Sequence, residues 1–239
     1  MKILGHRGAS ADHPENTLDA FAGAVQQGAD GVELDVMRCK SGELVVCHDE
    51  VLDRLAGVPV VVADARYLEL SQLDVGTPLG FGAARIPRLE EVLDAVPGHL
   101  WVNVELKCDV ADDRGLSAET ARLLKRRGEG PRVTVSSFNF DCLLRFGAVA
   151  PDYERGLLLD PERMLEAQLN WLDTAGKGAV HPHFTQCTPA TVAGWKKRGF
   201  KVVVWTVDDA AEARRLEGLG VDAVITNTPA KLRAALEAD

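Results

Sequence analysis

Two acidic side chains stand two residues apart in the segment Gly31–Val36, which reads Gly-Val-Glu-Leu-Asp-Val. In a β-strand, residues at this spacing point to the same face with Cα atoms roughly 7 Å apart, so Glu33 and Asp35 would be neighbours. A strand buried on both faces is expected to be apolar throughout, and adjacent carboxylates repel each other. The pair therefore needs solvent at a strand end, a partner arginine or a bound cation.

A second polar face occurs further along the chain. In the segment Trp101–Lys107, Asn103, Glu105 and Lys107 alternate with apolar residues and share one face of a predicted strand. If both segments belong to one parallel barrel, Glu105 lies beside the first acidic pair. Three carboxylates without a histidine or cysteine cluster favour a hard divalent cation, and the sequence leaves Mg²⁺ and Ca²⁺ both open.

Histidines lie at the expected carboxyl ends of strands. His6 follows the first predicted strand, and His48 follows a short apolar run at Leu44–Cys47. Two imidazoles beside a metal site can serve as general base and general acid near neutral pH, and which is which stays open. His181, which precedes Pro182, is predicted either to contact substrate or to stabilise a turn.

Two cations complete the predicted site. Arg7 and Lys107 would face the same cavity in an otherwise acidic chain. Together with a metal ion they favour an anionic ligand, above all a phosphate, which arginine binds through paired hydrogen bonds. The alternative is that they only neutralise the three carboxylates, and both roles are compatible.

These residues must be positioned by an alternation of short and long elements. Eight segments with strand character alternate along the chain with eight segments of helical spacing, which is typical of a (β/α)8 barrel. A doubly wound open sheet is the alternative, but the barrel is favoured because the polar residues at strand ends come from several different strands. The predicted strands are Ile3–Gly5, Gly31–Val36, Trp101–Leu106, Arg132–Val135, Arg155–Leu159, Ala179–His181, Lys201–Thr206 and Ala223–Thr226. The predicted helices are Leu18–Val25, Leu89–Val96, Ser117–Arg127, Phe140–Val149, Pro161–Leu169, Pro189–Arg198, Asp209–Leu219 and Ala230–Ala238.

One segment interrupts the alternation. Residues 50–87 contain glycines and prolines typical of turns and no clear strand–helix unit. We interpret them as a small inserted subdomain after the second strand, over the face where barrel active sites lie, within one domain spanning residues 1–239.

Composition excludes several classes of protein. The 239 residues carry 27 basic and 36 acidic side chains, a net charge of −9, which argues against nucleic-acid binding and stable membrane anchoring. No apolar stretch approaches the roughly 18 residues of a membrane helix, and no signal peptide is evident. Five widely spaced cysteines suit reduced thiols, so a cytoplasmic location is expected. The oligomeric state stays open.

The ordered motifs resemble one enzyme family, the glycerophosphodiester phosphodiesterases. The similar segments are Gly5-His6-Arg7-Gly8-Ala9-Ser10, Pro14-Glu15-Asn16-Thr17, Glu33-Leu34-Asp35, His48-Asp49, Glu105-Leu106-Lys107, Ser136-Ser137-Phe138, His181-Pro182, Trp205-Thr206-Val207 and Gly220-Val221-Asp222 with Thr226 and Pro229. Each motif alone is weak, but their order and spacing over residues 5 to 229 are specific.

The resemblance implies a barrel that hydrolyses glycerophosphodiesters to glycerol 3-phosphate and an alcohol. It implies roles for these residues: Glu33, Asp35 and Glu105 as metal ligands, His6 and His48 as acid and base, and Arg7 and Lys107 as phosphate-binding residues. Trp205 would wall the glycerol or alcohol side, with Phe81 of the insertion as a further apolar wall and His181 as an additional substrate contact.

Two departures and two alternatives accompany this interpretation. Asn227 stands where the family commonly has Asp, and we expect it to fix a loop with little effect on chemistry. The insertion, with Leu79-Gly80-Phe81-Gly82, is shorter than in common members of the family, which leaves the alcohol-side specificity open. Asn16 or Thr17 can cap the first helix, and Asn16 is expected to cap rather than to react. A related lysophospholipase D-like activity is the nearer alternative, although it needs an apolar entry for an acyl chain. A non-catalytic barrel that binds phosphate ligands is the more distant one.

Overall fold

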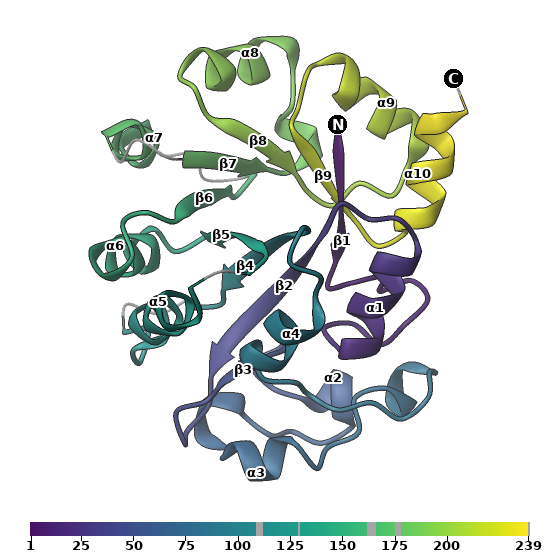
Figure 1. The fold of residues 1–239 in the computed structure, drawn as a ribbon, viewed down its shortest axis with the longest axis vertical. Coiled ribbons are helices and arrows are strands. Elements are labelled where there is room, and N and C mark those ends of the chain that lie inside the picture. The colour runs from purple at the N-terminus through teal and green to yellow at the C-terminus, as the bar shows by residue number, and fades with distance from the viewer. Residues whose placement is uncertain (109–111, 129, 162–165, 175–177, 239) are drawn as a thin grey trace.

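A closed barrel of parallel strands forms the centre of the molecule (Figure 1). This computed structural model describes residues 1–108, 112–128, 130–161, 166–174 and 178–238. In the described part of the chain, the order β1-β9-β8-β7-β6-β5-β4-β2 is closed by pairing of β1 with β2. The barrel strands are β1 (Lys2–His6), β2 (Gly31–Arg38), β4 (Trp101–Leu106), β5 (Arg132–Ser137), β6 (Glu154–Leu159), β7 (Gly178–Pro182), β8 (Lys201–Val204) and β9 (Ala223–Thr226).

Helices follow the strands and form the outer layer (Figure 1). They are α1 (Leu18–Gln26), α4 (Leu89–Ala95), α5 (Leu116–Arg127), α6 (Phe140–Val149), α7 (Glu166–Thr174), α8 (Pro189–Lys197), α9 (Ala210–Gly218) and α10 (Pro229–Glu237). The predicted (β/α)8 fold is therefore confirmed. Within the ranges described, no helix combines the length and the apolar character needed to span a bilayer.

Many element boundaries differ from the predictions, mostly by one or two residues. The strand predicted at Lys201–Thr206 ends at Val204, after which Trp205 makes one isolated bridge to His183. The helix predicted at Pro161–Leu169 begins only at Glu166, and residues 162–165 lie outside the described part.

The loop between β1 and α1 is held tightly against the helix it precedes. Thr17, not Asn16, is the N-cap of α1, because its Oγ1 accepts a hydrogen bond from the backbone N–H of Ala20. Gly8 has a φ of 86°, and a Cβ there would lie 2.4 Å from the backbone carbon of Ala20. Only glycine fits this position, so the loop that carries His6 and Arg7 is fixed to α1.

The insertion lies beyond β3 at the bottom of Figure 1 and has an apolar cluster of its own. Strand β3 (Leu44–Val46) pairs antiparallel with the end of β2. Leu52, Leu55 and Leu70 are buried in the cluster together with Ile86. The short helices of this region are α2 (Asp53–Ala56), η1 (Val62–Asp64), α3 (Tyr67–Leu70) and η2 (Thr77–Leu79). A separate turn of 3₁₀ helix, η3 (Phe184–Gln186), follows β7.

Apolar side chains between the barrel and its helices form two further clusters, one around β2 and β4 and one around β7 and β8. A smaller cluster of buried apolar residues, which includes Leu4, Val203 and Ile225, is separate from these two. The five cysteines are buried and form no disulfide in the described part of the chain. Burial of apolar surface on this scale fixes the strands, so the register of the barrel determines which polar side chains meet.

Candidate active site

The strand register brings the acidic residues together. Between β2 and β4, Asp35 pairs with Glu105 and Glu33 pairs with Asn103. Between β1 and β2, His6 pairs with Glu33. Parallel strands place these residues near the same end of the barrel, which explains why residues about 70 positions apart in the sequence become neighbours.

Glu33, Asp35 and Glu105 can each turn one carboxylate oxygen toward a common point, because those oxygens all lie within 4.8 Å of one another. Burial, followed by the neighbouring charges of Asp35 and Glu105, raises the pKa of Glu33 well above its usual range. Burial and the charge of Asp35 likewise raise the pKa of Glu105 to about 7, against the opposing effect of Lys107. The neighbouring cations therefore do not fully compensate the negative charge of the three carboxylates, and the carboxylate oxygens fit a hard divalent cation.

Arg7 is held in an unusual backbone conformation beside the acidic residues. Its φ is 56°, its backbone N–H donates to Glu33 Oε2 at 3.1 Å, and its Nε lies 3.2 Å from Asp35 Oδ2. Asn16, with a φ of 59°, donates from Nδ2 to the same Asp35 oxygen at 2.9 Å. Burial would lower the pKa of Arg7, but Asp35, Glu15 and Glu33 together raise it. Contrary to the expectation from the sequence, Asn16 therefore orients a carboxylate and does not cap α1.

Lys107 faces the same carboxylates from the end of β4. Its Nζ donates to Glu105 Oε1 at 3.0 Å and lies 3.8 Å from Asp35 Oδ1. Burial alone would lower its pKa, but these two carboxylates raise it. Both cations therefore stay charged beside the acidic residues, which is compatible with neutralising them and with binding an anion.

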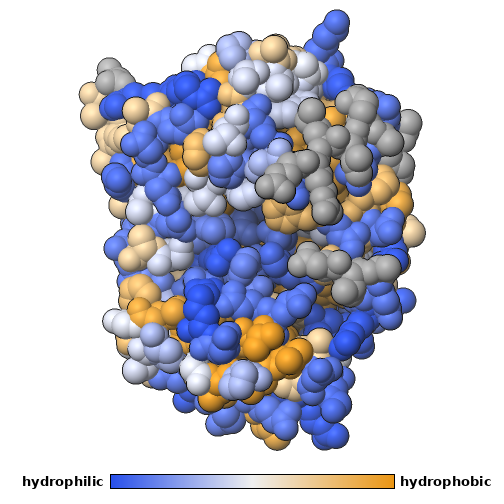
Figure 2. All heavy atoms as spheres, turned by 180° about the vertical axis from the view of Figure 1, so that it is seen from behind, coloured by the Kyte–Doolittle hydropathy of each residue, from blue (hydrophilic) through white to orange (hydrophobic). Residues whose placement is uncertain are grey.

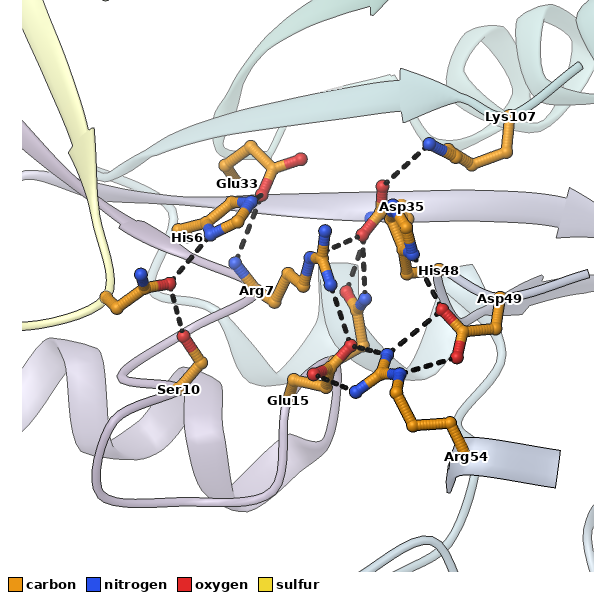
Figure 3. Close-up of polar contacts among 12 residues, drawn as sticks. His6, Arg7, Ser10, Glu15, Glu33, Asp35, His48, Asp49, Arg54 and Lys107 are labelled. Carbon is orange, nitrogen blue, oxygen red and sulfur yellow. Dashed lines mark hydrogen bonds and ion pairs between the residues drawn. The ribbon is translucent and has the colours of Figure 1, made fainter. Parts of the chain in front are cut away.

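His6 is oriented by an amide. Its Nδ1 lies 2.7 Å from Asn227 Oδ1, which also accepts from Ser10 at 2.8 Å (Figure 3). Asn227 Nδ2 donates to Asp208 at 2.6 Å, and since a carboxylate only accepts, the amide oxygen must face His6. The proton of His6 therefore sits on Nδ1, and Nε2, 3.9 Å from Glu33 Oε2, is left unprotonated. Burial and the charge of Arg7 lower the pKa of His6.

His48 is oriented by a carboxylate instead. Its Nδ1 lies 2.8 Å from Asp49 Oδ1, so Nδ1 carries a proton here too (Figure 3). Asp49 is in turn bound by Arg54 of α2, whose Nε and Nη2 donate at 2.7 and 3.0 Å. The two histidines thus have the same tautomer but partners of different charge.

A cavity of about 150 Å³ joins these groups. Its lining residues are His6, Arg7, Glu33, His48, Asn103, Glu105, Lys107, Phe138, Leu158, Trp205, Thr206 and Ile225. Figure 2 shows, on the face behind that of Figure 1, a hollow near the middle with hydrophilic residues gathered around it and a hydrophobic patch below. Phe138, 39% exposed, meets Trp205 edge to face at 5.5 Å between ring centroids.

Most of the predicted site residues border this cavity. Asp35 does not border it, but Asp35 contacts Arg7 and Lys107, which do. Two predicted substrate contacts, Phe81 and His181, are absent from the described lining. Phe81 lies just after η2, where its backbone N–H donates to the Gly76 carbonyl. His181 is fully buried on β7, where a Cβ on Gly156 would lie 2.4 Å from its ring, and its carbonyl accepts from the Trp205 indole at 2.7 Å.

The sequence analysis missed several residues. Phe138 and Leu158 line the cavity without having been proposed for it. Asn227 joins the loop after β9 to Asp208, as expected, and it also orients His6, a contact that was not predicted. Asp49 could have been found from the motif His48-Asp49, where it directly follows a predicted site histidine. Nothing in the sequence indicated Arg54.

A parallel (β/α)8 barrel whose carboxyl-terminal end gathers three carboxylates, two cations and two imidazoles defines a class of protein, the barrel hydrolases of phosphate esters. Comparison with known proteins shows which family within this class the chain resembles. The model of the glycerophosphoryl diester phosphodiesterase family matches residues 6–231. A glycerophosphodiester phosphodiesterase of Caldanaerobacter subterraneus subsp. tengcongensis is 36% identical, over 96% of this chain and 95% of its own.

Solved structures agree with the sequence match. That of an Oleispira antarctica phosphodiesterase in complex with the product sn-glycerol-3-phosphate has a TM-score of 0.88 at 30% identity, over 99% of this chain and 97% of that one. A glycerophosphodiester phosphodiesterase from Thermotoga maritima has a TM-score of 0.81 at 30% identity, over 98% of this chain and 97% of its own. The chain belongs to the glycerophosphoryl diester phosphodiesterase family and is an enzyme that hydrolyses glycerophosphodiesters.

Proposed function

We propose that the protein hydrolyses glycerophosphodiesters to glycerol 3-phosphate and an alcohol in a reaction that depends on a divalent cation and two histidines. The observation that carries this proposal is the register that sets Asp35 opposite Glu105 and His6 opposite Glu33 at one end of the barrel. No simpler role explains why three carboxylates are gathered where burial raises the pKa of two of them.

Glu33, Asp35 and Glu105 would hold the cation. Three carboxylate oxygens within 4.8 Å of one another suit Mg²⁺ or Ca²⁺. A bound divalent ion would supply Lewis-acid stabilisation of charge on the phosphate oxygens. Arg7 and Lys107, both charged at this end of the barrel, would bind the non-bridging oxygens and orient the diester for attack.

The partners of the two histidines support different roles for them. Asp49 is a carboxylate on Nδ1 of His48, so its negative charge would balance the positive charge of the ring when both nitrogens carry protons. His48 would therefore give its Nε2 proton to the leaving alcohol oxygen. His6, whose Nδ1 proton is held by the neutral Asn227, presents an unprotonated Nε2 that would take the proton of the attacking oxygen.

The apolar lining would contact the organic part of the substrate. Trp205 and Phe138 form an edge-to-face pair that borders the cavity, and Leu158 extends this wall. The Trp205 indole is anchored on the His181 carbonyl, so His181 would act on the substrate only through this tryptophan. A substrate contact by Phe81 stays a prediction.

Product analysis tests the proposal. The purified protein is incubated with glycerophosphocholine, glycerophosphoethanolamine, glycerophosphoglycerol and lysophosphatidylcholine, each with and without chelator. The phosphate product is measured, which is glycerol 3-phosphate from the deacylated diesters and lysophosphatidate from lysophosphatidylcholine. We expect release from the deacylated diesters that stops in chelator and returns with added Mg²⁺ or Ca²⁺. Undiminished release in chelator would disprove the metal dependence. Faster cleavage of the lysophospholipid would favour the lysophospholipase D alternative, and binding without release would favour a non-catalytic barrel.

A further inference from the structure

The insertion contributes one side chain that reaches two loops of the barrel. Arg54, on α2, forms paired hydrogen bonds with Glu15 and with Asp49. Its Nη1 and Nη2 donate to Glu15 at 2.9 and 2.8 Å, while Nε and Nη2 donate to Asp49 at 2.7 and 3.0 Å. Figure 3 shows the guanidinium of Arg54 between these two carboxylates.

Each carboxylate also touches a residue that borders the cavity. Asp49 accepts the Nδ1 proton of His48 at 2.8 Å, and Glu15 accepts from Arg7 at 2.8 Å. Figure 3 shows this chain of contacts running from His48 through Asp49 and Arg54 to Glu15 and Arg7. One guanidinium of the insertion is therefore two contacts away from both a histidine and a cation of the site.

The two branches differ in how much they depend on Arg54. Arg7 has a second carboxylate partner, Asp35 at 3.2 Å, and remains fixed without Arg54. Asp49 has no second cation of this kind, because within the described chain its side chain bonds only to Arg54 and His48. A planar guanidinium fixes the plane of a carboxylate through two parallel bonds, which a lysine cannot do.

We propose that Arg54 is a positioning residue, which holds the Asp49 carboxylate in the plane that keeps a proton on Nδ1 of His48. The inference rests on the proposed function for its effect on turnover, but not for its effect on the tautomer. The insertion, by this arrangement, sets the proton chemistry of the barrel site rather than only covering it. The opposite charges of Arg54 and Asp49 also lower the pKa of Asp49 against the effect of burial, which keeps this carboxylate ionised as an acceptor.

The experiment compares Arg54→Ala and Arg54→Lys with a matched control, Arg85→Ala. Arg85 belongs to the same insertion, and its Nη1 donates to the Gln72 carbonyl at 3.0 Å. With glycerophosphodiester as substrate, we expect kcat of Arg54→Ala to fall about 10- to 100-fold, as for other residues that orient a site group, with less change in KM. Arg54→Lys should lose nearly as much, Arg85→Ala should match wild type, and millimolar guanidinium should partly restore Arg54→Ala.

A double-mutant comparison tests the route through Asp49. If Arg54 acts through Asp49, then Arg54→Ala combined with Asp49→Asn should be no slower than Asp49→Asn alone. Losses that multiply would overturn the proposal. A loss expressed mainly in KM would also overturn it, because that result places the effect on Glu15 and Arg7.

The tautomer provides a readout that does not depend on catalysis. At a pH where the ring is neutral, nitrogen-15 NMR of the histidine side chains should show His48 with its proton on Nδ1 in the wild type and in Arg85→Ala, and a mixture of tautomers in Arg54→Ala. An unchanged His48 spectrum with a kcat within twofold of wild type would refute the role of Arg54. If wild type hydrolyses no diester, the proposed function fails, whereas the spectrum still decides the role of Arg54. Should Arg54→Ala not fold, the same spectra of Arg54→Lys decide it.

Discussion

The cavity has a charged side and an apolar side, and they come from different parts of the barrel. The charged side is built from β1, β2 and β4 with their loops, and carries His6, Glu33 and Glu105. The apolar side is built from β5, β6, β8 and β9 or the residues directly after them, and includes Phe138 and Trp205. A diester with a phosphate at its centre and organic groups at its ends needs both surfaces, so the barrel divides binding of charge and binding of carbon between its two halves.

The two sides differ in their cost to folding. On the charged side, burial raises the pKa of Glu33 and of Glu105, so ionising these groups in the folded protein is unfavourable. On the apolar side, burial of Leu158 and of the Trp205 ring is itself favourable. Substitutions on the charged side should therefore cost turnover, and those on the apolar side should cost affinity.

The largest effect is expected from the histidines. His6→Ala and His48→Ala should each lower kcat by about 10²- to 10⁴-fold, since each removes a group that transfers a proton. His99→Ala, which changes an exposed loop residue, is the matched control and should keep wild-type rates. Rates are measured by glycerol 3-phosphate release, and circular dichroism checks the fold. A variant with normal turnover would remove that histidine from the mechanism.

Glu105→Gln should lower activity by about 100-fold at a metal concentration that saturates the wild type. The amide keeps the size of the side chain but loses the charge that attracts a cation. Titration calorimetry with Mg²⁺ and with Ca²⁺ should give a weaker dissociation constant for the variant. Equal metal affinity in both proteins would exclude Glu105 as a ligand.

Trp205→Ala should affect substrate affinity more than turnover. Loss of the edge-to-face pair with Phe138 and of contact with the organic group should cost about 1.4 kcal/mol, a tenfold rise in KM with a smaller change in kcat. Initial rates over a range of substrate concentrations separate the two constants. If kcat falls while KM stays, the division between a charged side and an apolar side is wrong.

The last prediction concerns stability at low pH rather than activity. His181 is buried, both ring nitrogens lack a hydrogen-bond partner within the described chain, and burial lowers its pKa from 6.5 to about 4. The unfolded chain therefore binds more protons between those two pH values, so the free energy of unfolding should decrease by about 3 kcal/mol as the pH falls through this window.

Urea unfolding of wild type and His181→Gln at several pH values measures this contribution as the difference in slope. Glu33 and Glu105 act in the opposite direction, because a raised pKa of an acid favours the folded state at low pH. The comparison of the two proteins cancels their contribution. Parallel pH profiles would show that His181 is not held neutral by burial.

The sequence predicted the parts of the site that depend on local pattern. Alternation along two segments predicted that Glu33 and Asp35 share a face and that Asn103 and Glu105 do, and the eightfold repeat of strand and helix predicted the barrel. It could not predict Asn227 beside His6, because that contact joins residues 221 positions apart. Arg54 was equally hidden, since an arginine in a loop-rich segment has no periodic pattern to distinguish it.

Side-chain periodicity and the order of elements are properties of a single strand or helix, and these were determined by the sequence itself. Which carboxylates meet, which nitrogen of each histidine carries the proton, and which residue of the insertion reaches the site depend on the register between strands and on loop packing. Those arise only when the apolar clusters close around the barrel, because the free energy that selects one register is summed over contacts between distant segments.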